Sequence, residues 1–309
     1  MNKLLVLGTI AFDSIESPFG KAEKIIGGSA SYIALAASKY EIIPQVISIV
    51  GDDFPIDYLE GLRKQNIDIE GVKIVKGKKT FHWKGKYHVD LNTRDTLATD
   101  LNVLEDFDPV VPLSYMRPDF AILGNVHPSI QMSVIRQIDH RPRLVAMDTM
   151  NYWIENTYEE LLSVLRKVDV IIINDEEARL LSDEYSLIKA AKFIYTLGPE
   201  YVIIKKGENG ALLFHRDEVF FAPALPLEEV FDPTGAGDTF AGGFMGYISC
   251  TSDVSFDNIK RAVIAGSNMA SFCVEQFGTR RMENVTNREI KNRLQQFKEL
   301  TQFELKINQ

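Results

Sequence analysis

Residues 232–244 read Asp-Pro-Thr-Gly-Ala-Gly-Asp-Thr-Phe-Ala-Gly-Gly-Phe, a glycine-rich turn that runs directly into an apolar stretch. Pro233 and Gly235 are typical turn residues, and the apolar spacing from Thr239 to Ser249 predicts a buried helix. A glycine-rich turn at a helix start leaves backbone N–H groups unpaired at the positive end of the helix dipole. The stretch therefore predicts an anion site.

Asp238 lies in the same turn. A carboxylate beside a site that favours negative charge repels phosphate, so Asp238 is a poor phosphate ligand. It makes chemical sense as a base that takes a proton while the backbone holds the phosphate. The plain alternative is that Gly235 and Gly237 only cap a core helix, and an isolated Gly-x-Gly-Asp favours that alternative.

Composition restricts the class of protein. The 309 residues suffice for one large α/β domain or two small ones, with 45% hydrophobic and 25% charged residues. A net charge of −9 argues against nucleic-acid and anionic-membrane partners. Cys250 and Cys273 fall in apolar helical stretches, which predicts buried, inert thiols in a reduced compartment. The chain shows neither a signal-peptide pattern nor a run of 18 apolar residues, so we expect a cytoplasmic protein.

Short apolar runs alternate with helical patterns along the chain. Alternation of this kind predicts a mostly parallel sheet covered by helices on both faces. The predicted strands are Lys3–Gly8, Val46–Gly51, Phe120–Gly124, Leu144–Asp148, Val170–Asn174 and Val202–Lys206. The predicted helices are Ser29–Tyr40, Ile56–Gln65, Ser129–Ile138, Tyr158–Val168, Leu187–Tyr195, Asp238–Ser249, Ser255–Val274 and Asn287–Thr301.

Two segments interrupt this alternation. From Thr80 to Leu91 apolar and polar residues alternate, which is typical of an antiparallel strand with one wet face. The polar segment Ser14–Ile26 also leaves the main pattern. We expect a small β lid inserted into one domain (1–309) at about residues 14–26 and 72–100, with an ordinary edge hairpin as the alternative.

The thirteen-residue string resembles the C-terminal signature of the ribokinase-like (PfkB) carbohydrate kinase family, and further family features follow in order along nearly the whole chain. The resemblance implies a three-layer α/β/α fold. It also implies a catalytic base at Asp238 and an anion hole from the N–H groups of Gly235, Ala236 and Gly237.

The acceptor side is predicted from two N-terminal features. Asp13 ends the first strand–loop unit, where ligands bind in open α/β sheets, although a turn cap is equally compatible with it. Family members use an Asp at this point to hold acceptor hydroxyls. Gly27 and Gly28 resemble the family's Gly-Gly turn, but Tyr32 stands where the family usually has Asn. An aromatic ring there suggests a larger or partly apolar acceptor.

The nucleotide side is predicted from two strand ends. Asn174 and Glu177 match the family's Asn-x-x-Glu, which supports Mg²⁺ largely through water, and ordinary helix capping is the alternative. The turn after Val202–Lys206 resembles the family's nucleotide-lining turn, and a hairpin turn is the alternative. Its expected nucleotide contacts are Lys205, Gly207 and Gly210.

Six further positions are weaker candidates. Ser267 and Asn268 lie where the family's adenine wall falls. Asp232 is the candidate ligand for a monovalent cation such as K⁺, as in some relatives. Arg94, after the predicted lid strand, is a candidate phosphoryl contact or a solvated loop residue. His127 and Asp148 both end strands, and each admits a site role or a local structural one.

We therefore expect an ATP-dependent, Mg²⁺-dependent kinase that phosphorylates a hydroxyl of a sugar or sugar-like acceptor. A nucleoside kinase of the same superfamily is the first alternative, because Tyr32 and the aromatic lid would suit a base. A catalytically degenerate sugar-binding regulator is a more remote one. A dehydrogenase is disfavoured because no Gly-x-Gly-x-x-Gly follows the first strand. The apolar face of Phe81, Trp83 and Tyr87 predicts a lid underside or a homodimer contact.

Overall fold

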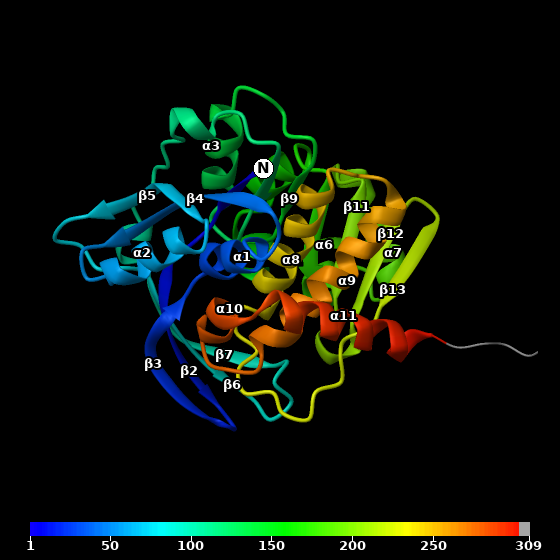
Figure 1. The fold of residues 1–309 in the computed structure, drawn as a ribbon. Helices are drawn as coiled ribbons and strands as arrows, with labels where there is room; N and C mark the ends of the chain where they lie inside the picture. Colours follow the sequence, from blue (N-terminus) through cyan, green and yellow to red (C-terminus); the bar gives the residue numbers. More distant parts are fainter. Residues whose placement is uncertain (303–309) are drawn as a thin grey trace, which may run out of the picture.

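A nine-stranded sheet forms the centre of the protein, whose computed structural model describes residues 1–302 (Figure 1). Its strand order is β13-β12-β11-β10-β9-β8-β1-β4-β5. Strands β11 to β5 of that order pair in parallel, whereas β12 and β13 form an antiparallel edge. The strands are β1 (Asn2–Leu7), β4 (Ile42–Gly51), β5 (Asp68–Val75), β8 (Phe120–Leu123), β9 (Val145–Met147), β10 (Val170–Asn174), β11 (Tyr201–Lys205), β12 (Ala211–His215) and β13 (Glu218–Ala222).

Helices cover both faces of this sheet, which confirms the predicted three-layer α/β fold (Figure 1). Alternate residues of β1 belong to two separate cores, with Leu4 and Val6 on one face and Leu5 and Leu7 on the other. The first core is covered by α1 (Ser29–Ala37), α2 (Ile56–Lys64), α8 (Ala236–Thr251), α9 (Phe256–Cys273), α10 (Arg280–Asn284) and α11 (Asn287–Thr301). The second is covered by α3 (Pro128–Gln137), α4 (Asn151–Asn156), α5 (Tyr158–Leu165), α6 (Asp175–Ser182) and α7 (Leu187–Leu197).

A separate four-stranded sheet lies at one end of the molecule, where the sequence predicts a lid (Figure 1). Its order is β3-β2-β6-β7, and β2 and β6 pair in parallel while the other pairs are antiparallel. The strands are β2 (Ala11–Ser17), β3 (Gly20–Gly27), β6 (His82–Tyr87) and β7 (Arg94–Asp100). Residues 72–75 of the predicted lid segment belong instead to β5 in the central sheet.

The alternating pattern of β6 is realised only in part. Tyr87 is buried and Trp83 half-buried on one face, whereas Lys84 and Lys86 on the other face are exposed. The prediction that the strand continues to Leu91 is wrong, because Val89 lies beyond β6 and is 87% exposed.

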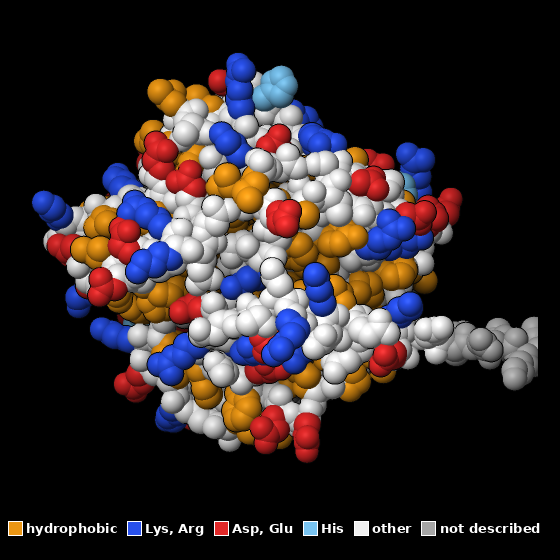
Figure 2. Space-filling model, in the orientation of Figure 1, with side chains coloured by type: hydrophobic (Ala, Val, Ile, Leu, Met, Phe, Trp, Pro, Cys, Tyr) orange, Lys and Arg blue, Asp and Glu red, His pale blue; other side chains and the backbone are white. Residues whose placement is uncertain are grey.

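Two surface features need comment. Cys273 is buried, but the prediction of a core thiol at Cys250 is wrong, because this residue is exposed in the last turn of α8. On the face shown in Figure 2, Lys and Arg side chains are interspersed with Asp and Glu rather than gathered in one basic region. Across residues 1–302, no helix is long and apolar enough to cross a membrane.

Helix α8 packs against its neighbours through glycines that allow close backbone approach. A Cβ added at Gly242 would overlap the backbone carbonyl oxygen of Ile33 in α1. A Cβ at Gly243 would lie 2.8 Å from Met269 Cγ in α9. The position of α8, and hence of the turn that begins it, therefore depends on residues without side chains.

We expect Gly242→Ala to lower the free energy of unfolding by about 1–3 kcal/mol, because backbone cannot rotate away from the added methyl group. Gly61→Ala in α2 is the matched control, since a Cβ there meets nothing within 4 Å. The control should raise stability by up to about 1 kcal/mol through helix propensity. Urea unfolding measures both, and equal effects of the two substitutions would contradict the packing argument.

Candidate active site

Three neighbouring strands end at the same edge of the central sheet, and each carries a polar side chain there. Asp148 follows β9, Asn174 ends β10 and Lys205 ends β11, with Asn174 and Lys205 paired in register. The carboxyl ends of parallel strands are where open α/β sheets bind ligands. The start of α8 lies at this edge, because Lys205 Nζ would be 2.8 Å from a Cβ placed on Gly237.

The turn before α8 has the geometry of an anion site, with one departure from the prediction. Gly235 caps α8 in the left-handed region at φ 75°, a conformation that glycine adopts without strain. The N–H of Ala236 donates to Pro233 O at 3.2 Å and is therefore used within the turn. Among the described residues, the N–H groups of Gly235 and Gly237 have no protein acceptor. These two and the Lys205 ammonium give the turn its positive character.

Asp238, in the first turn of α8, is half-buried, and its Oδ1 is buried without a hydrogen-bond partner. Burial and the nearby carboxylate of Asp148 raise its pKa from 3.8 to about 7, while Lys205 and Arg94 oppose the rise. An unpaired carboxylate oxygen that titrates near neutral pH can accept a proton from a bound hydroxyl.

Asp148 and Glu177 contribute two more carboxylates to this edge. Lys205 Nζ lies 3.7 Å from Asp148 Oδ1, which also accepts a hydrogen bond from the N–H of Thr149 at 2.9 Å. Burial raises the pKa of Asp148, and Lys205 works against the rise. Burial and the charge of Asp148 raise the pKa of Glu177 to about 7. The edge thus carries more negative charge than its cations offset.

Asn174 and Glu177 form a capping box at the start of α6. Asn174 Oδ1 accepts from the N–H of Glu177 at 2.7 Å, and Glu177 Oε2 accepts from the N–H of Asn174 at 2.8 Å. The capping alternative is therefore realised in the structure. Within residues 1–302, no three His, Cys, Asp or Glu side chains converge to hold a metal directly. Water-mediated support of Mg²⁺ by Asn174 and Glu177 stays a prediction.

Asp13 lies in β2 and is held against the Gly27–Gly28 turn. A Cβ at Gly27 would overlap Asp13 Oδ2, and Gly28 has φ 91°, so both glycines are required where they stand. Asp13 is 5% exposed, and burial raises its pKa to about 7. The charges of Asp232 and Asp238 add to the rise, and the backbone of Gly28 opposes it. Asp13 and Asp238 are therefore electrostatic neighbours, as a site between them requires.

Asp232 is fully buried and joins two segments. Its Oδ1 accepts from the N–H of Thr234 at 2.9 Å, and its Oδ2 accepts from the N–H of Gly278 at 3.1 Å. These bonds lower its pKa, which burial raises. Each carboxylate oxygen thus has a backbone donor without a cation, and K⁺ at Asp232 stays a prediction.

The structure places Tyr32 differently from the sequence expectation. Tyr32 is 1% exposed, and its ring lies where a Cβ on Gly235 would be. The ring supports the anion turn from beneath and has no face open to an acceptor. Burial raises the pKa of its hydroxyl well above the usual value.

Several contacts join the lid to the segments at this edge. Tyr87 and Thr234 hydroxyls are 3.1 Å apart, and Ser17 Oγ donates to Phe231 O at 3.0 Å. The side chain of Asn92 lies against Gly207, where it would overlap an added Cβ. The lid therefore reaches both the anion turn and the turn after β11.

Arg94 pairs with Tyr87 in the lid, and cross-strand partners point to the same face of a sheet. Its charge lowers the pKa values of Asp148, Glu177 and Asp238. Arg94 is itself exposed at the start of β7, within electrostatic range of these carboxylates, and its contact with a phosphoryl group stays a prediction.

Of the remaining nucleotide candidates, Gly207 is exposed, whereas Gly210, Ser267 and Asn268 are buried. Gly207 and Gly210, at φ 54° and 78°, form the tight connection between β11 and β12, as the hairpin alternative requires. Ser267 and Asn268 are both buried, and Asn268 Nδ2 donates to Ile290 O at 3.3 Å. Neither side chain presents an open wall in this structure.

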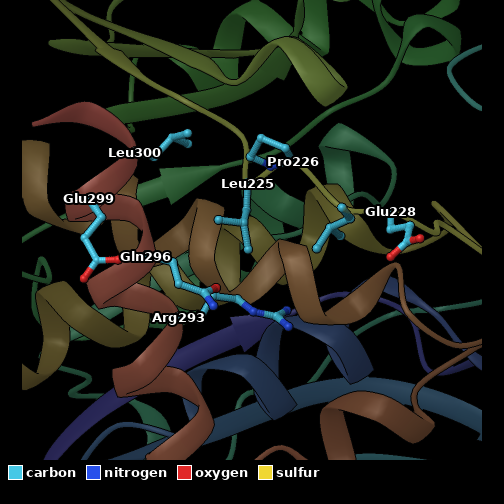
Figure 3. A pocket seen from close by; sticks show the side chains of 8 residues that line it. Leu225, Pro226, Glu228, Arg293, Gln296, Glu299 and Leu300 are labelled. Atoms are coloured by element: carbon cyan, nitrogen blue, oxygen red, sulfur yellow. The ribbon is translucent and has the colours of Figure 1, made fainter.

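A surface hollow lies elsewhere, between α11 and the segment that leads to the anion turn (Figure 3). None of the six residues predicted to contact the nucleotide lines it. Its lining residues are Leu225, Pro226, Leu227, Glu228, Arg293, Gln296, Glu299 and Leu300.

Sequence reasoning gave no role to an amide–indole pair beside this edge. Trp153 Nε1 donates to Asn125 Oδ1 at 2.8 Å, and the Trp153 ring packs edgewise on His127 at 5.0 Å. His127 itself caps α3, because its Nδ1 accepts from the N–H of Ser129 at 3.1 Å. Asn125 could have been identified as a candidate site residue from the sequence, because it comes just after a buried strand, as Asp148 does.

The comparisons with known proteins agree with this geometry. Residues 1–286 match the family described as "pfkB family carbohydrate kinase". A cytidine kinase of Thermococcus kodakarensis is 29% identical over 256 residues, which are 79% of this chain and 88% of the relative.

Two solved structures are similar across nearly their whole length. The nucleoside kinase of Burkholderia thailandensis, solved with inosine, is 21% identical with a TM-score of 0.76, covering 95% of this chain and 98% of that one. A putative ribokinase II from E. coli, solved with ATP and Mg²⁺, is 19% identical with a TM-score of 0.74, covering 96% and 100%. At these identities the similarity establishes the fold alone.

The chain belongs to the PfkB family of carbohydrate kinases. It is accordingly a phosphotransferase that acts on a hydroxyl group, and kinases of this family generally use ATP and Mg²⁺.

The raised pKa of Asp13 predicts a pH-dependent effect on stability. At pH 8 the carboxylate is ionised in both states, so folding buries a charge; at pH 5 the folded state keeps it protonated and the cost falls. We expect Asp13→Asn to raise the melting temperature at pH 8, with the gain shrinking towards pH 5. Asp57→Asn, at an exposed position in α2, is the control. An equal gain at both pH values would contradict the assigned burial.

Proposed function

We propose that this protein transfers the γ-phosphoryl group of ATP to a hydroxyl of a nucleoside, with a free sugar as the second candidate acceptor. The observation that carries the proposal is the unpaired Oδ1 of Asp238, beside the anion turn and within electrostatic range of Asp13. The cytidine kinase and nucleoside kinase among its relatives favour a nucleoside over a free sugar.

The proposed roles follow from chemistry and position. Asp13 accepts hydrogen bonds from acceptor hydroxyls and holds the reacting oxygen near Asp238. Asp238 takes the proton as that oxygen bonds to the γ-phosphorus and the bond to the ADP oxygen breaks. The N–H groups of Gly235 and Gly237, with Lys205, stabilise the charge on the transferred group.

Mg²⁺ fits the donor set at the strand ends, which is rich in carboxylates and poor in nearby cations. Asp148, Asn174 and Glu177 would hold it through water, since Mg²⁺ retains several waters and few carboxylates. When bound, it neutralises charge on the phosphate oxygens.

Arg94 is the lid's contribution in this proposal. Its guanidinium carries a permanent charge and suits planar phosphate oxygens. Closure of the lid brings it to the carboxylate cluster and excludes water, which strengthens every charge interaction inside.

Asp238→Asn is the direct test of the base. The amide keeps the shape but cannot take the proton, so we expect kcat to fall on the order of 10²–10⁴-fold, with little change in ATP binding. Phosphorylated acceptor is measured directly, so that background ATP hydrolysis is not counted.

Asp57→Asn serves again as the control and should retain full turnover. Near-normal kcat in Asp238→Asn would contradict the assignment of Asp238 as the catalytic base. Failure of the wild-type protein to phosphorylate any nucleoside or sugar would favour a degenerate, binding-only protein.

A thermal-shift panel separates the two acceptor classes, because a ligand that binds only the folded state raises its melting temperature. We expect nucleosides to shift the melting temperature more than free pentoses or hexoses at equal concentration. Asp13→Asn should abolish the shift by either class. A shift with sugars and none with nucleosides would reverse the order of the two candidates.

A further inference from the structure

The lid has one face turned towards the anion turn, and its contacts identify that face. Tyr87 reaches Thr234 and Ser17 reaches Phe231, at 3.1 and 3.0 Å. Lys84 and Lys86 are exposed on the opposite face of β6, and Lys86 pairs there with Glu16. Residues that alternate with these lysines therefore face the site.

Trp83 stands on the site-facing side, next to Asp13. The two residues are register partners on the adjacent parallel strands β6 and β2. Neighbouring strands are about 4.8 Å apart, so an acceptor held by Asp13 extends naturally onto Trp83. The Trp83 side chain is half-buried, so part of the indole remains accessible.

The indole is held flat along the strand. Its six-membered ring lies where a Cβ on Gly85 would be, and Trp83 Nε1 donates to Thr96 Oγ1 at 3.3 Å. No aromatic ring among residues 1–302 packs against it. A glycine in the middle of a strand usually weakens the strand, but the absence of its side chain also leaves room for another group to approach the backbone closely. Here that space seats the ring.

From this geometry we propose that Trp83, seated on Gly85, is the stacking platform for the nucleobase of the acceptor, an inference that rests on the proposed nucleoside kinase function. Asp13 takes the hydroxyls, so the sugar lies at β2 and the flat ring of the base lies over β6. The sequence suggested that both Tyr32 and the aromatic lid would suit a base, but Tyr32 is buried under the anion turn. Trp83 determines specificity and takes no part in the proton transfer.

Steady-state kinetics with cytidine, adenosine and inosine in turn, and with ribose as the base-free acceptor, test the proposal. Trp83→Ala removes the stacking of the nucleobase on an aromatic ring, so we expect the KM for nucleosides to rise on the order of 10-fold. The kcat and the KM for ribose should stay unchanged. Trp83→Phe should recover part of the loss. Gly85→Ala displaces the ring without altering it and should raise the nucleoside KM similarly, whereas Lys84→Ala on the opposite face should not.

A binding readout avoids dependence on turnover. The chain has two tryptophans, so Trp153→Phe leaves Trp83 as the sole indole emitter. Cytidine, adenosine or inosine should quench this emission, and ribose should not. Quenching that persists after Asp238→Asn would support the stacking role of Trp83 independently of the proposed catalytic role of Asp238.

The outcomes are distinguishable. Nucleoside phosphorylation with an unchanged KM in Trp83→Ala overturns the platform and leaves the proposed function standing. Absence of nucleoside binding and turnover in the wild type overturns both. A change in sedimentation from dimer to monomer in Trp83→Ala, with unchanged KM, assigns the lid face to contact between two copies and also overturns the platform.

Discussion

Excess negative charge at the start of α8 is the constraint on which the rest of the structure depends. Asp148, Glu177 and Asp238 share this edge with the cations Lys205 and Arg94, and burial raises the pKa of each carboxylate. Such an arrangement costs folding free energy that the two cores must supply. In the proposed function, binding of a cation–nucleotide complex at this edge would relieve that cost and so stabilise the fold.

The fold was predictable because its determinants are local and repeated. Strands buried on both faces read as apolar runs, and the 232–244 string marks the start of α8. Tyr32 was placed wrongly because its burial depends on Gly235, two hundred residues away, which leaves room for the ring. Asp148 was left undecided because an acidic residue after a strand has the same pattern whether it caps a turn or serves a site. In the structure its Oδ1 accepts the N–H of Thr149 and also lies 3.7 Å from Lys205 Nζ, a contact between strands that a local pattern does not contain.

The lid is attached to the main body by hydrogen bonds and by apolar packing, which includes the ring pairs Phe12–Phe54 and Phe19–Phe231. The Tyr87–Thr234 and Ser17–Phe231 hydrogen bonds each contribute on the order of 1 kcal/mol, and the Asn92–Gly207 contact adds packing. Arg94 lowers the pKa of Asp238, so the attraction between these two side chains would strengthen as the carboxylate ionises.

The charge around Asp13 also limits the class of acceptor. Burial raises the pKa of Asp13, and the charges of Asp232 and Asp238 add to the rise. Lys205 and Arg94 lower the pKa values of the other three carboxylates, those of Asp148, Glu177 and Asp238. A phosphorylated sugar would bring further negative charge to this end and meet repulsion. A neutral acceptor with several hydroxyls would instead donate hydrogen bonds to the carboxylates of Asp13 and Asp238 and reduce the repulsion between them. These charges would disfavour a sugar phosphate as the acceptor, and the proposed Trp83 platform would distinguish nucleosides from free sugars.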